Sequence, residues 1–475
     1  MHGSVMHRID PRARISHPGG PVLIGAELIR MIDRVADDLR HQLPSGCVVG
    51  LYADNSAHWA IADLALQQAG MVCIPVPGFF TPSQIGQLLT AYPVQAVIAP
   101  LLPAALAAAG FTKKAELPGE TPLILCVREV AESATQGFLP SAKLTFTSGS
   151  TGDPKGILLS ATQQWQVAIS LAQALQSLGM TRHLAMLPMS VLLENVAGLY
   201  TGLHLGAEVM LPPLSDVGLS GSSGFDAEKA IEAIIASDAE SVILLPQMLR
   251  DLVFALQCTG RSLTHLKFVA VGGGKVAEGL LHDARRLGLP VYEGYGLSEA
   301  CSVVSLNTPV ADRIGSVGKP LAHQSVRIAD DGEIEVGQPG EPWLSTGDLG
   351  SVDADGFLFV TGRKKNVLIT SFGRNVSPEW PESLLQRFPE IAQVMVYGEA
   401  QPKLSALIVP SRLDVSRVQL QAVIDEANQS LPDYAQIGSW QVLETAFSVS
   451  DGLLTANGRP RRAQIIEFYQ SRIQA

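Results

Sequence analysis

The stretch from Leu144 to Gly156 reads Leu-Thr-Phe-Thr-Ser-Gly-Ser-Thr-Gly-Asp-Pro-Lys-Gly. Hydroxyl side chains alternate with glycines, and Lys155 follows near the end. Glycine lets a backbone approach a ligand closely and turn its N–H groups toward it. The hydroxyls are further donors, and a lysine adds a point charge suited to phosphate. Pro154 precedes the lysine where a Walker A loop requires glycine, so the stretch predicts a phosphate-binding loop of another kind. For a run of this composition in isolation, a flexible Gly/Ser loop is the alternative.

Segments on both sides of this stretch alternate between two apolar patterns. Short apolar runs indicate buried strands, and apolar residues at helical spacing indicate helices. Strands are expected at residues 47–51, 71–75, 94–98, 241–245, 268–271 and 290–292. Helices are expected at residues 24–43, 58–69 and 83–89. Alternation of this kind predicts parallel sheets with helices on their faces.

From about Gly315 onward short strands dominate the pattern. Asp331-Gly332 and Asp355-Gly356 are dipeptides typical of hairpin turns. Strands are expected at residues 326–328, 333–336, 357–360, 367–369, 394–397 and 406–409, and a helix at 417–429. These segments predict a β-rich subdomain followed by a smaller α+β domain. Residues 219–224, Leu-Ser-Gly-Ser-Ser-Gly, are expected to form a flexible linker.

The composition limits the class of protein. The chain has 475 residues, of which 47% are hydrophobic and 17% charged, enough to fill a large core and too apolar for a disordered chain. With 34 Lys and Arg against 45 Asp and Glu, the net charge is −11, which disfavours general nucleic-acid binding. The longest apolar stretch, residues 96–111, is interrupted by Pro100 and Pro103, so no membrane span is expected.

Cysteine spacing and the first residues bear on location. The five cysteines lie far apart without Cys-x-x-Cys spacing, which argues against a structural zinc site and a disulfide scaffold and fits a reducing cytosol. Arg8, Asp10 and Arg12 follow the first residues, and no apolar run of a signal peptide accompanies them. A soluble, cytoplasmic, multi-domain α/β protein is therefore expected.

The Leu144–Gly156 string resembles the signature loop of the acyl-adenylate-forming, or AMP-binding, enzyme superfamily. This superfamily includes acyl-CoA synthetases, adenylation domains of peptide synthetases and luciferases. Four further segments resemble its other motifs in the expected order, and the resemblance extends over essentially the whole chain. They are Gly294–Glu299, Thr346–Asp348, Gly362–Lys365 and Gly373–Pro378.

The resemblance implies a role for individual residues. Tyr295 would stack on adenine, Ser298 would bond the α-phosphate, and Glu299 would hold Mg²⁺, as a carboxylate does beside phosphate oxygens. Asp348 and Arg363 would contact the ribose. Taken singly, Asp348 is a common turn residue, Glu299 a common first-turn acid and Arg363 part of a solvated charge run. Only their order and spacing together favour a nucleotide site.

The resemblance also implies a catalytic set and a hinge. Lys155, Glu299 and Arg459 would act on the reacting groups, Lys365 would be the hinge of the small domain, and Gly373–Pro378 would help to form a tunnel for a thiol. The implied nucleotide-binding residues are Thr147, Ser148, Gly149, Ser150, Thr151, Gly152, Gly273, Gly274, Glu293, Gly294, Tyr295, Ser298, Asp348 and Arg363.

Residues 272–277 fit a second pattern. They follow an expected strand, match Gly-x-Gly-x-x-Ala, and are followed about twenty residues later by Glu293, as a dinucleotide-binding fingerprint requires. The resemblance instead implies a Gly-rich turn here that lines the adenine and acyl site. Because the other motifs agree with the AMP-binding pattern, we favour that interpretation over a nicotinamide cofactor.

The sequence departs from the family pattern at Arg459. There the family has a lysine that bridges the substrate carboxylate and the α-phosphate. Arginine keeps the charge and can bind both anions, but it is planar and bulkier. This leaves the first half-reaction open, and a solvated basic tail around Arg459 is the alternative.

A second departure lies in Leu187–Val191, where the histidine usual in the family is absent. The aspartate that recognises an α-amino group in amino-acid-activating members is also absent, with Leu193 near its place. We expect an apolar acyl pocket with few polar groups, which favours a fatty or aryl acid over an amino acid. The candidate lining residues are Val191, Leu193, Glu194, Asn195 and Gly272.

The implied fold is α/β. A large N-terminal domain, residues 1–363, would contain two parallel α/β subdomains plus a β-rich subdomain, and residues 364–475 would form a small mobile α+β domain. The implied activity uses ATP and Mg²⁺ to activate a carboxylic acid as an acyl-adenylate. A thiol of CoA or of a phosphopantetheine on an acyl carrier protein would then form a thioester, which defines an AMP-forming acid–thiol ligase.

Two alternatives stay open. The first is a same-fold enzyme that passes the adenylate to an amine or an internal hydroxyl. The second is a non-adenylating nucleotide-binding homologue, motivated by Arg459. The identity of the acid, the acceptor and the oligomeric state are not predicted.

Overall fold

The computed structural model describes residues 5–17, 20–78, 80, 82–118, 123–129, 142–148, 154–221, 224–338, 342–371, 374–449, 451–455 and 459–473. The chain divides into two compact units. The first comprises residues 1–244, 263–270 and 296–303. The second comprises residues 245–262, 271–295 and 304–475.

The first unit contains a seven-stranded sheet in the order β6-β7-β5-β3-β4-β8-β9. Four adjacent strands are parallel, as the strand–helix alternation predicted: β3 (Val48–Leu51), β4 (Val72–Pro75), β5 (Ala96–Ala99) and β8 (Lys143–Ser148). Two strands run antiparallel to these four: β7 (Ile124–Val127), beside β5, and the edge strand β9 (Pro154–Leu159), beside β8. The other edge strand, β6 (Thr112–Glu116), pairs antiparallel with β7. The parallel core is confirmed, and the antiparallel strands β7 and β9 are an addition to the predicted topology.

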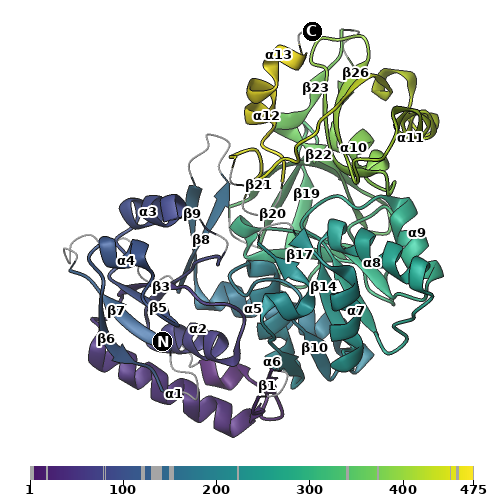
Figure 1. Ribbon diagram of the computed structural model, residues 1–475. Helices are drawn as coiled ribbons and strands as arrows, with labels where there is room; N and C mark the ends of the chain where they lie inside the picture. The colour runs from purple at the N-terminus through teal and green to yellow at the C-terminus, as the bar shows by residue number, and fades with distance from the viewer. Residues whose placement is uncertain are drawn as a thin grey trace. The chain divides into compact units, whose positions relative to one another are not determined.

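Helices cover both faces of this sheet (Figure 1). They are α1 (Gly25–Gln42), α2 (Ala57–Gln68), α3 (Pro82–Ala91) and α4 (Ala104–Ala108). On one face α2 contacts β3 and β4, and α1 packs against α2. Because α2 lies between the sheet and α1, it is buried on nearly all sides, including the polar Asp63 and Gln67. The other face packs on α3 and α4 through residues such as Ile85, Leu88 and Leu106.

A second set of strands in the first unit follows the order β14-β10-β11-β1-β2. All are parallel except β2: β14 (Ser241–Leu244), β10 (Arg182–Leu184), β11 (Glu208–Met210), β1 (Arg14–Ser16) and β2 (Leu23–Ile24). The accompanying helices are α5 (Ala161–Leu175), a π-helix η5 (Leu193–Tyr200), α6 (Thr201–Leu205) and α7 (Ala227–Ala236). Three strands contribute residues to both units: β15 (Phe268–Val271), β16 (Val291–Leu297) and β17 (Ser302–Leu306).

The expected linker at residues 219–224 is partly structured, so that prediction was wrong. Leu219–Ser220 (β12) pairs antiparallel with Gly224–Phe225 (β13). Gly218 and Gly221 take left-handed φ values of +82° and +59°, which allow the chain to turn back on itself. The apolar Leu219 and Phe225 are thereby placed opposite each other.

The second unit carries a four-stranded antiparallel sheet in the order β19-β20-β21-β22. The strands are β19 (Ser325–Ile328), β20 (Glu333–Gly337), β21 (Leu344–Val352) and β22 (Leu358–Arg363). The two predicted Asp-Gly turns are confirmed, since they join β19 to β20 and β21 to β22, with Gly332 and Gly356 at φ +85° and +84°. This unit also contains α8 (Pro246–Thr259), α9 (Glu278–Arg286) and β18 (Lys319–Pro320).

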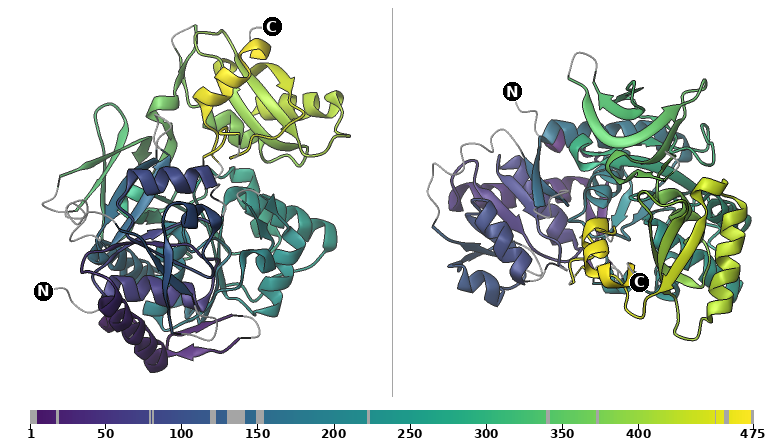
Figure 2. Two further views of the ribbon diagram at one scale, coloured as in Figure 1. Left: turned by 60° about the vertical axis from the view of Figure 1, so that its left-hand side comes forward. Right: turned by 90° about the horizontal axis from the view of Figure 1, so that it is seen from above.

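The C-terminal residues of the second unit form a small α+β fold, as predicted. Their elements are η8 (Lys364–Asn366), β23 (Leu368–Ile369), β24 (Asn375–Val376), α10 (Glu379–Leu385), β25 (Ile391–Tyr397), β26 (Leu404–Pro410), α11 (Arg417–Gln429), β27 (Ile437–Val442), α12 (Arg462–Phe468) and α13 (Gln470–Ile473). Alternate side chains of β25 enter different cores, because successive residues of a strand point to opposite faces. Val394 and Val396 pack with α11, while Met395 and Tyr397 pack with α12. The two helices accordingly lie on opposite sides of the sheet (Figure 2).

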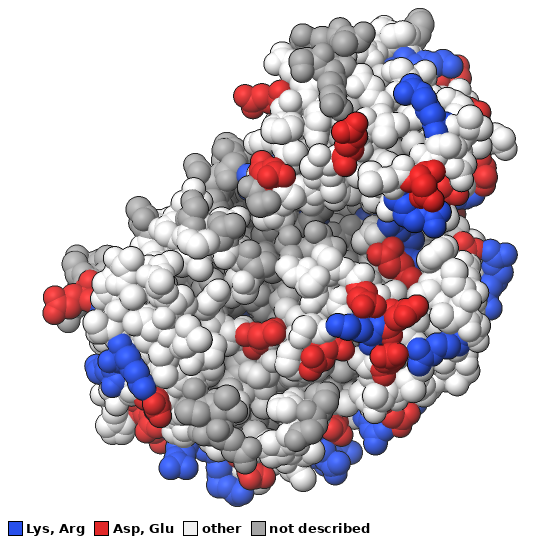
Figure 3. Space-filling view, viewed as in Figure 1, with Lys and Arg blue, Asp and Glu red and all other residues white. Residues whose placement is uncertain are grey.

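Charged side chains are distributed over the surface. On the face seen in Figure 3, Lys and Arg are interspersed with Asp and Glu. Within the described ranges no helix is both long enough and apolar enough to cross a bilayer.

Candidate active site

The glycine-rich loop connects two paired strands of the first unit. β8 and β9 are antiparallel, with Thr147 opposite Lys155 and Ser148 opposite Pro154. The backbones of Thr147, Ser148 and Lys155 therefore meet at the base of the loop. The predicted residues Gly149, Ser150, Thr151 and Gly152 lie outside the described residues.

Tyr92 fixes the end of this loop. The Gly156 N–H donates to the Tyr92 hydroxyl at 2.8 Å, and the Tyr92 ring packs edge-on against Phe146 on β8. A Cβ at position 156 would lie only 2.4 Å from the Tyr92 hydroxyl. Glycine is therefore required where Tyr92 supports β9.

We expect Gly156→Ala to lower the free energy of unfolding by about 1–3 kcal/mol, because the added methyl forces Tyr92 off β9. Urea denaturation of the purified variant measures this change. Tyr92→Leu in the same chain should recover part of the loss, since it removes the hydroxyl that collides. If Gly156→Ala lowers the free energy of unfolding by the same amount in the native chain and in the Tyr92→Leu chain, the steric explanation is contradicted.

The turn that carries Glu299 lies against β8. β16 ends at Leu297, and a single 3₁₀ turn, η7 (Ser298–Ala300), follows and contacts β8. Glu299 is exposed, and its carboxylate has no ion-pair partner among the described residues. The structure thus brings Ser298 and Glu299 together with the strand that ends at Thr147 and Ser148.

Glu299 fits the metal that the resemblance implied. Among the described residues no three His, Cys, Asp or Glu side chains gather as ligands. Mg²⁺ usually takes one or two carboxylates from a protein and its other ligands from phosphates and water. One exposed carboxylate without an ion-pair partner in the described part of the chain suits such an ion.

In the second unit Tyr295, Asp348 and Arg363 form one hydrogen-bonded group. The Tyr295 hydroxyl donates to Asp348 Oδ2 at 2.7 Å, and Arg363 Nε lies 2.7 Å from Asp348 Oδ1. Asp348 on β21 faces Arg363 on β22 in register. Burial raises the pKa of the Asp348 carboxyl, and the neighbouring Arg363 and Tyr295 act to lower it. Each carboxylate oxygen keeps a lone pair that can accept from a ribose hydroxyl.

The Gly-rich turn after β15 holds Arg459. The Arg459 guanidinium donates to the carbonyl oxygen of Gly273 from Nε at 3.0 Å and from Nη2 at 2.7 Å. Its charge also acts to lower the pKa of Asp348. Gly272 approaches Gly294, since a Cβ on Gly272 would lie 3.2 Å from the Gly294 carbonyl oxygen. Arg459 therefore belongs to the same part of the second unit as the Tyr295–Asp348–Arg363 group.

The segment around Arg459 is ordered by its neighbours. Thr455 and Arg459 exchange backbone and hydroxyl hydrogen bonds of 2.8 and 3.1 Å. The half-buried Arg462 pairs with the buried Glu382, with Nη1 2.7 Å from Oε1. Arg459 is itself exposed, and these contacts hold the segment that carries it.

Two predicted nucleotide residues of the Gly-rich region differ in exposure. Gly274 is exposed, whereas Glu293 is buried and accepts from the Val276 N–H at 3.4 Å. Burial raises the pKa of Glu293 to about 8. A buried carboxyl turned toward the protein does not resemble the free acid that a dinucleotide fingerprint offers to a ribose.

Lys365 lies between two anchored residues. Lys364 Nζ contacts Asp331 at 2.6 Å and Glu333 at 2.8 Å, and the Asn366 amide donates to Glu379 at 2.5 Å. The Lys365 side chain is exposed. Its role as a hinge stays a prediction.

Four of the five predicted acyl-pocket residues lie in the first unit and separate into two pairs, while Gly272 belongs to the second unit. Val191 and Leu193 are half-buried. Glu194 is fully buried: it pairs with His183 at 2.7 Å and accepts from the N–H groups of Met186 and Leu187 at 3.2 and 3.0 Å. The Glu194 side chain thus holds the chain segment before the π-helix, and a direct contact with an acyl group stays a prediction.

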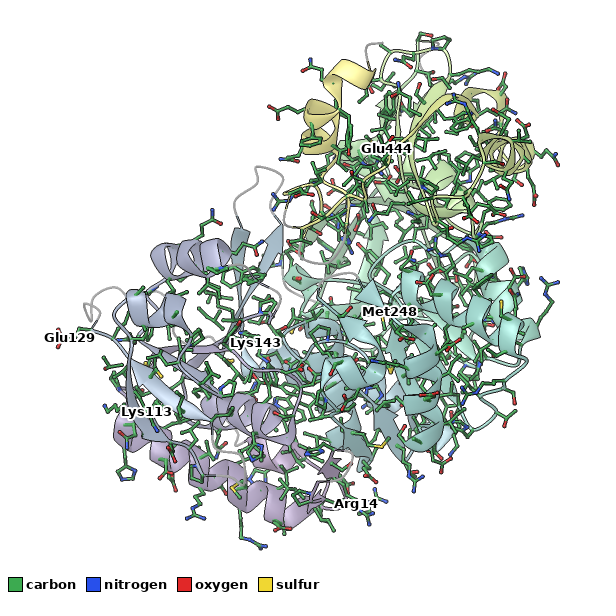
Figure 4. All side chains as sticks on the ribbon, viewed as in Figure 1. Arg14, Lys113, Glu129, Lys143, Met248 and Glu444 are labelled. Carbon is green, nitrogen blue, oxygen red and sulfur yellow. The ribbon has the colours of Figure 1, made fainter. Side chains whose placement is uncertain are left out.

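Asn195 joins a buried polar cluster that the sequence did not reveal. The Lys143 ammonium contacts Asp63 at 2.9 Å and the Asn195 amide oxygen, and Tyr200 donates to Asp63 at 2.8 Å. Lys143 is the first residue of β8, and it lies inside the first unit, unlike the peripheral Lys113 (Figure 4). The cluster therefore ties the strand that ends at the glycine-rich loop to α2 and to the π-helix.

We expect Lys143→Met to lower the free energy of unfolding by about 3–5 kcal/mol, because it leaves Asp63 buried without a counter-charge. Urea denaturation is the measurement. The double variant Asp63→Leu/Lys143→Met should recover most of the loss, and Lys113→Met should change little, because its pair with Glu116 is exposed. Equal losses in the single and double variants would contradict the electrostatic explanation.

Comparison with known proteins gives the family. The family model described as AMP-binding enzyme matches residues 23–350, and the one described as AMP-binding enzyme C-terminal domain matches residues 365–475. The chain therefore belongs to the AMP-binding enzyme family, as its motifs indicated.

Comparison with individual proteins gives relatives of low sequence identity or partial coverage. The chain is 33% identical over 245 residues to long-chain-fatty-acid–CoA ligase FadD15 of Mycobacterium bovis, a match that covers 43% of this chain and 41% of that protein. It is 25% identical over 442 residues to 2-succinylbenzoate–CoA ligase of Listeria monocytogenes, covering 88% of each. The structure of anthranilate CoA ligase AuaEII with anthranoyl-AMP has a TM-score of 0.78 at 18% identity, covering 97% of this chain and 95% of that one. This last likeness shows the fold.

Proposed function

We propose that the protein uses ATP to activate a carboxylic acid as an acyl-adenylate and then transfers the acyl group to a thiol. The observation that carries this proposal is the contact of Arg459 with Gly273, in the same part of the second unit as the Tyr295–Asp348–Arg363 group. A cation beside ribose-binding groups is where a substrate carboxylate and an α-phosphate need charge stabilisation. Membership of the AMP-binding family supports the proposal.

In the first step a carboxylate oxygen of the acid attacks the α-phosphorus of ATP. The bond from that phosphorus to its bridging oxygen breaks, and pyrophosphate leaves. Arg459 holds the carboxylate and the negative charge that develops, while Lys155 and the hydroxyls of Thr147–Thr151 bind phosphate oxygens. Mg²⁺, when bound at Glu299, neutralises phosphate charge.

In the second step the thiol sulfur attacks the acyl carbonyl carbon. The carbon–oxygen bond of the mixed anhydride breaks, AMP leaves, and the thiol proton passes to solvent. We place the domain boundary between residues 363 and 364, with Lys365 as the hinge. The anchoring of Lys364 and Asn366 on either side supports this choice.

A fatty or aryl acid is the proposed substrate. The relatives reported above are named as CoA ligases of long-chain fatty acids and of 2-succinylbenzoate. The carboxyl of Glu194 and the amide of Asn195 are occupied by buried partners, which leaves the apolar Val191 and Leu193 as candidate lining. CoA is the proposed thiol, and a carrier-protein phosphopantetheine is the second choice.

The test is acid-dependent release of pyrophosphate from ATP and Mg²⁺, over fatty, aryl and amino acids, with hydroxylamine trapping the adenylate. We expect release with one fatty or aryl class, and thioester only when a thiol is added. Release that leads to an amide or a lactone without CoA would favour the alternative acceptor. No release with any acid would favour a nucleotide-binding homologue that does not adenylate.

A further inference from the structure

The turn that follows Glu299 has an unusual backbone. Cys301 and Ser302 have φ values of +63° and +105°. Among the described residues they are the only neighbouring non-glycine pair with positive φ. Side chains with a Cβ avoid this region, and a φ near +105° is rare even for polar residues. A glycine at either position would adopt these angles without strain.

The surrounding structure forces this conformation. The Cys301 N–H donates to the Ser298 carbonyl at 3.0 Å, which closes the turn around Glu299. The Gly296 backbone lies close to Ser302, since a Cβ added to Gly296 would lie 1.8 Å from the Ser302 carbonyl oxygen. The Ser302 hydroxyl donates to the Leu192 carbonyl at 3.4 Å. Both Cys301 and Ser302 are buried, so the turn cannot relax into solvent.

Glu299 is the exposed residue of this otherwise enclosed turn. Its helical turn contacts β8, and its carboxylate has no ion-pair partner in the described part of the chain. An uncommitted side chain can point in many directions unless its backbone is fixed. Cys301 and Ser302, buried and held at positive φ, restrict the backbone within three residues of the carboxylate.

We propose that Cys301 and Ser302 are positioning residues whose restricted backbone holds Glu299 in the orientation that binds a Mg²⁺–nucleotide. This inference rests on the proposed function, because it assigns Glu299 to the metal. Glycine is sterically acceptable at both positions, but it would let the turn sample other conformations. The backbone strain at Cys301 and Ser302 therefore serves to keep the Glu299 side chain in one orientation.

The test compares Ser302→Gly with Ser302→Ala. Both variants lose the hydrogen bond to Leu192, but alanine keeps the Cβ that restricts the backbone. Binding of a non-hydrolysable ATP analogue is measured by calorimetry as a function of Mg²⁺ concentration, together with the melting temperature without ligand. We expect Ser302→Gly to raise the Mg²⁺ concentration for half-maximal binding about 5–10-fold, which is up to roughly a tenfold loss of affinity. The melting temperature should change little.

Ser302→Ala should stay near the native Mg²⁺ dependence. Ala400→Gly is the matched control, because Ala400 is exposed and has φ +58° in the second unit. Cys301→Gly, compared with Cys301→Ala, repeats the test if Ser302→Gly fails to fold. An unchanged Mg²⁺ dependence in the glycine variants would overturn the inference, as would a shift matched by a fall in melting temperature or shared by Ser302→Ala. Absence of Mg²⁺-dependent binding in the native protein would instead overturn the proposed function.

Discussion

Glu299→Gln is expected to lower the rate of acid-dependent pyrophosphate release about a hundredfold and to raise the Mg²⁺ concentration that half-saturates it. Glutamine keeps the shape of the side chain but has no charge to hold the cation, and a metal contributes several kcal/mol to charge stabilisation in phosphoryl chemistry. The melting temperature should not change, because Glu299 is exposed and contacts no cation among the described residues. Initial rates over a Mg²⁺ titration are the measurement.

Glu228→Gln is the control for this experiment. Glu228 is exposed in the first turn of α7, in the same unit as Glu299, and the same change of charge there should leave both the rate and the Mg²⁺ dependence unchanged. A native Mg²⁺ dependence in Glu299→Gln would remove this residue from the metal site and would leave the single-carboxylate interpretation without support.

Arg459→Ala is expected to slow adenylate formation about 10²–10³-fold while leaving the second half-reaction nearly unchanged. The Arg459 guanidinium donates to the Gly273 carbonyl, and its charge acts to lower the pKa of Asp348. Alanine removes the cation that we propose stabilises the substrate carboxylate and the α-phosphate. The two half-reactions can be separated by supplying a synthetic acyl-adenylate and measuring thioester formation directly. Arg459→Lys should retain adenylation, because the charge is kept.

Arg461→Ala controls for the net charge of the same segment, and both half-reactions should remain near the native rate. Equal slowing of both half-reactions in Arg459→Ala would show that Arg459 does not act selectively in adenylation. A native chain that fails to adenylate any acid, together with an Arg459→Lys variant that does, would establish the non-adenylating alternative.

The parts of the fold that could be predicted are those with strong periodicity. The helix expected at 417–429 begins and ends at those residues, because Ser416 and Gln419 form a capping box and four buried residues recur at helical spacing. The strands β10, β11 and β1 were missed. Each has three residues, too few to show a period, and each is defined by pairing with strands far away in the sequence.

The π-helix was also missed, for a different reason. Pattern reading assumes 3.6 residues per turn, and a wider helix changes which side chains share a face. Glu194 and Asn195 were therefore assigned to an acyl pocket by their place in the motif alone. In the structure their side chains reach His183 and Lys143 in the interior of the first unit.

The candidate site was predictable where a motif is continuous in sequence. Tyr295, Asp348 and Arg363 were selected from three separate motifs, and the structure joins them by hydrogen bonds. The Asp63–Lys143 pair was not predicted, because its members are 80 positions apart and a lone charge is usually solvated. A signal existed for Asp63, which stands inside the apolar run of residues 60–66, where an unpaired charge would be costly.

The Asp63–Lys143 pair also constrains how this sequence can evolve. A lineage that loses one charge first passes through a destabilised intermediate, so the two positions are expected to be inherited and replaced together. Lys143 directly precedes the signature loop, whereas Asp63 lies on α2, outside every nucleotide motif. The residue beside the loop is therefore expected to evolve together with a residue of α2. Grafting the loop together with Lys143 onto a distant relative would then succeed only when position 63 is exchanged as well.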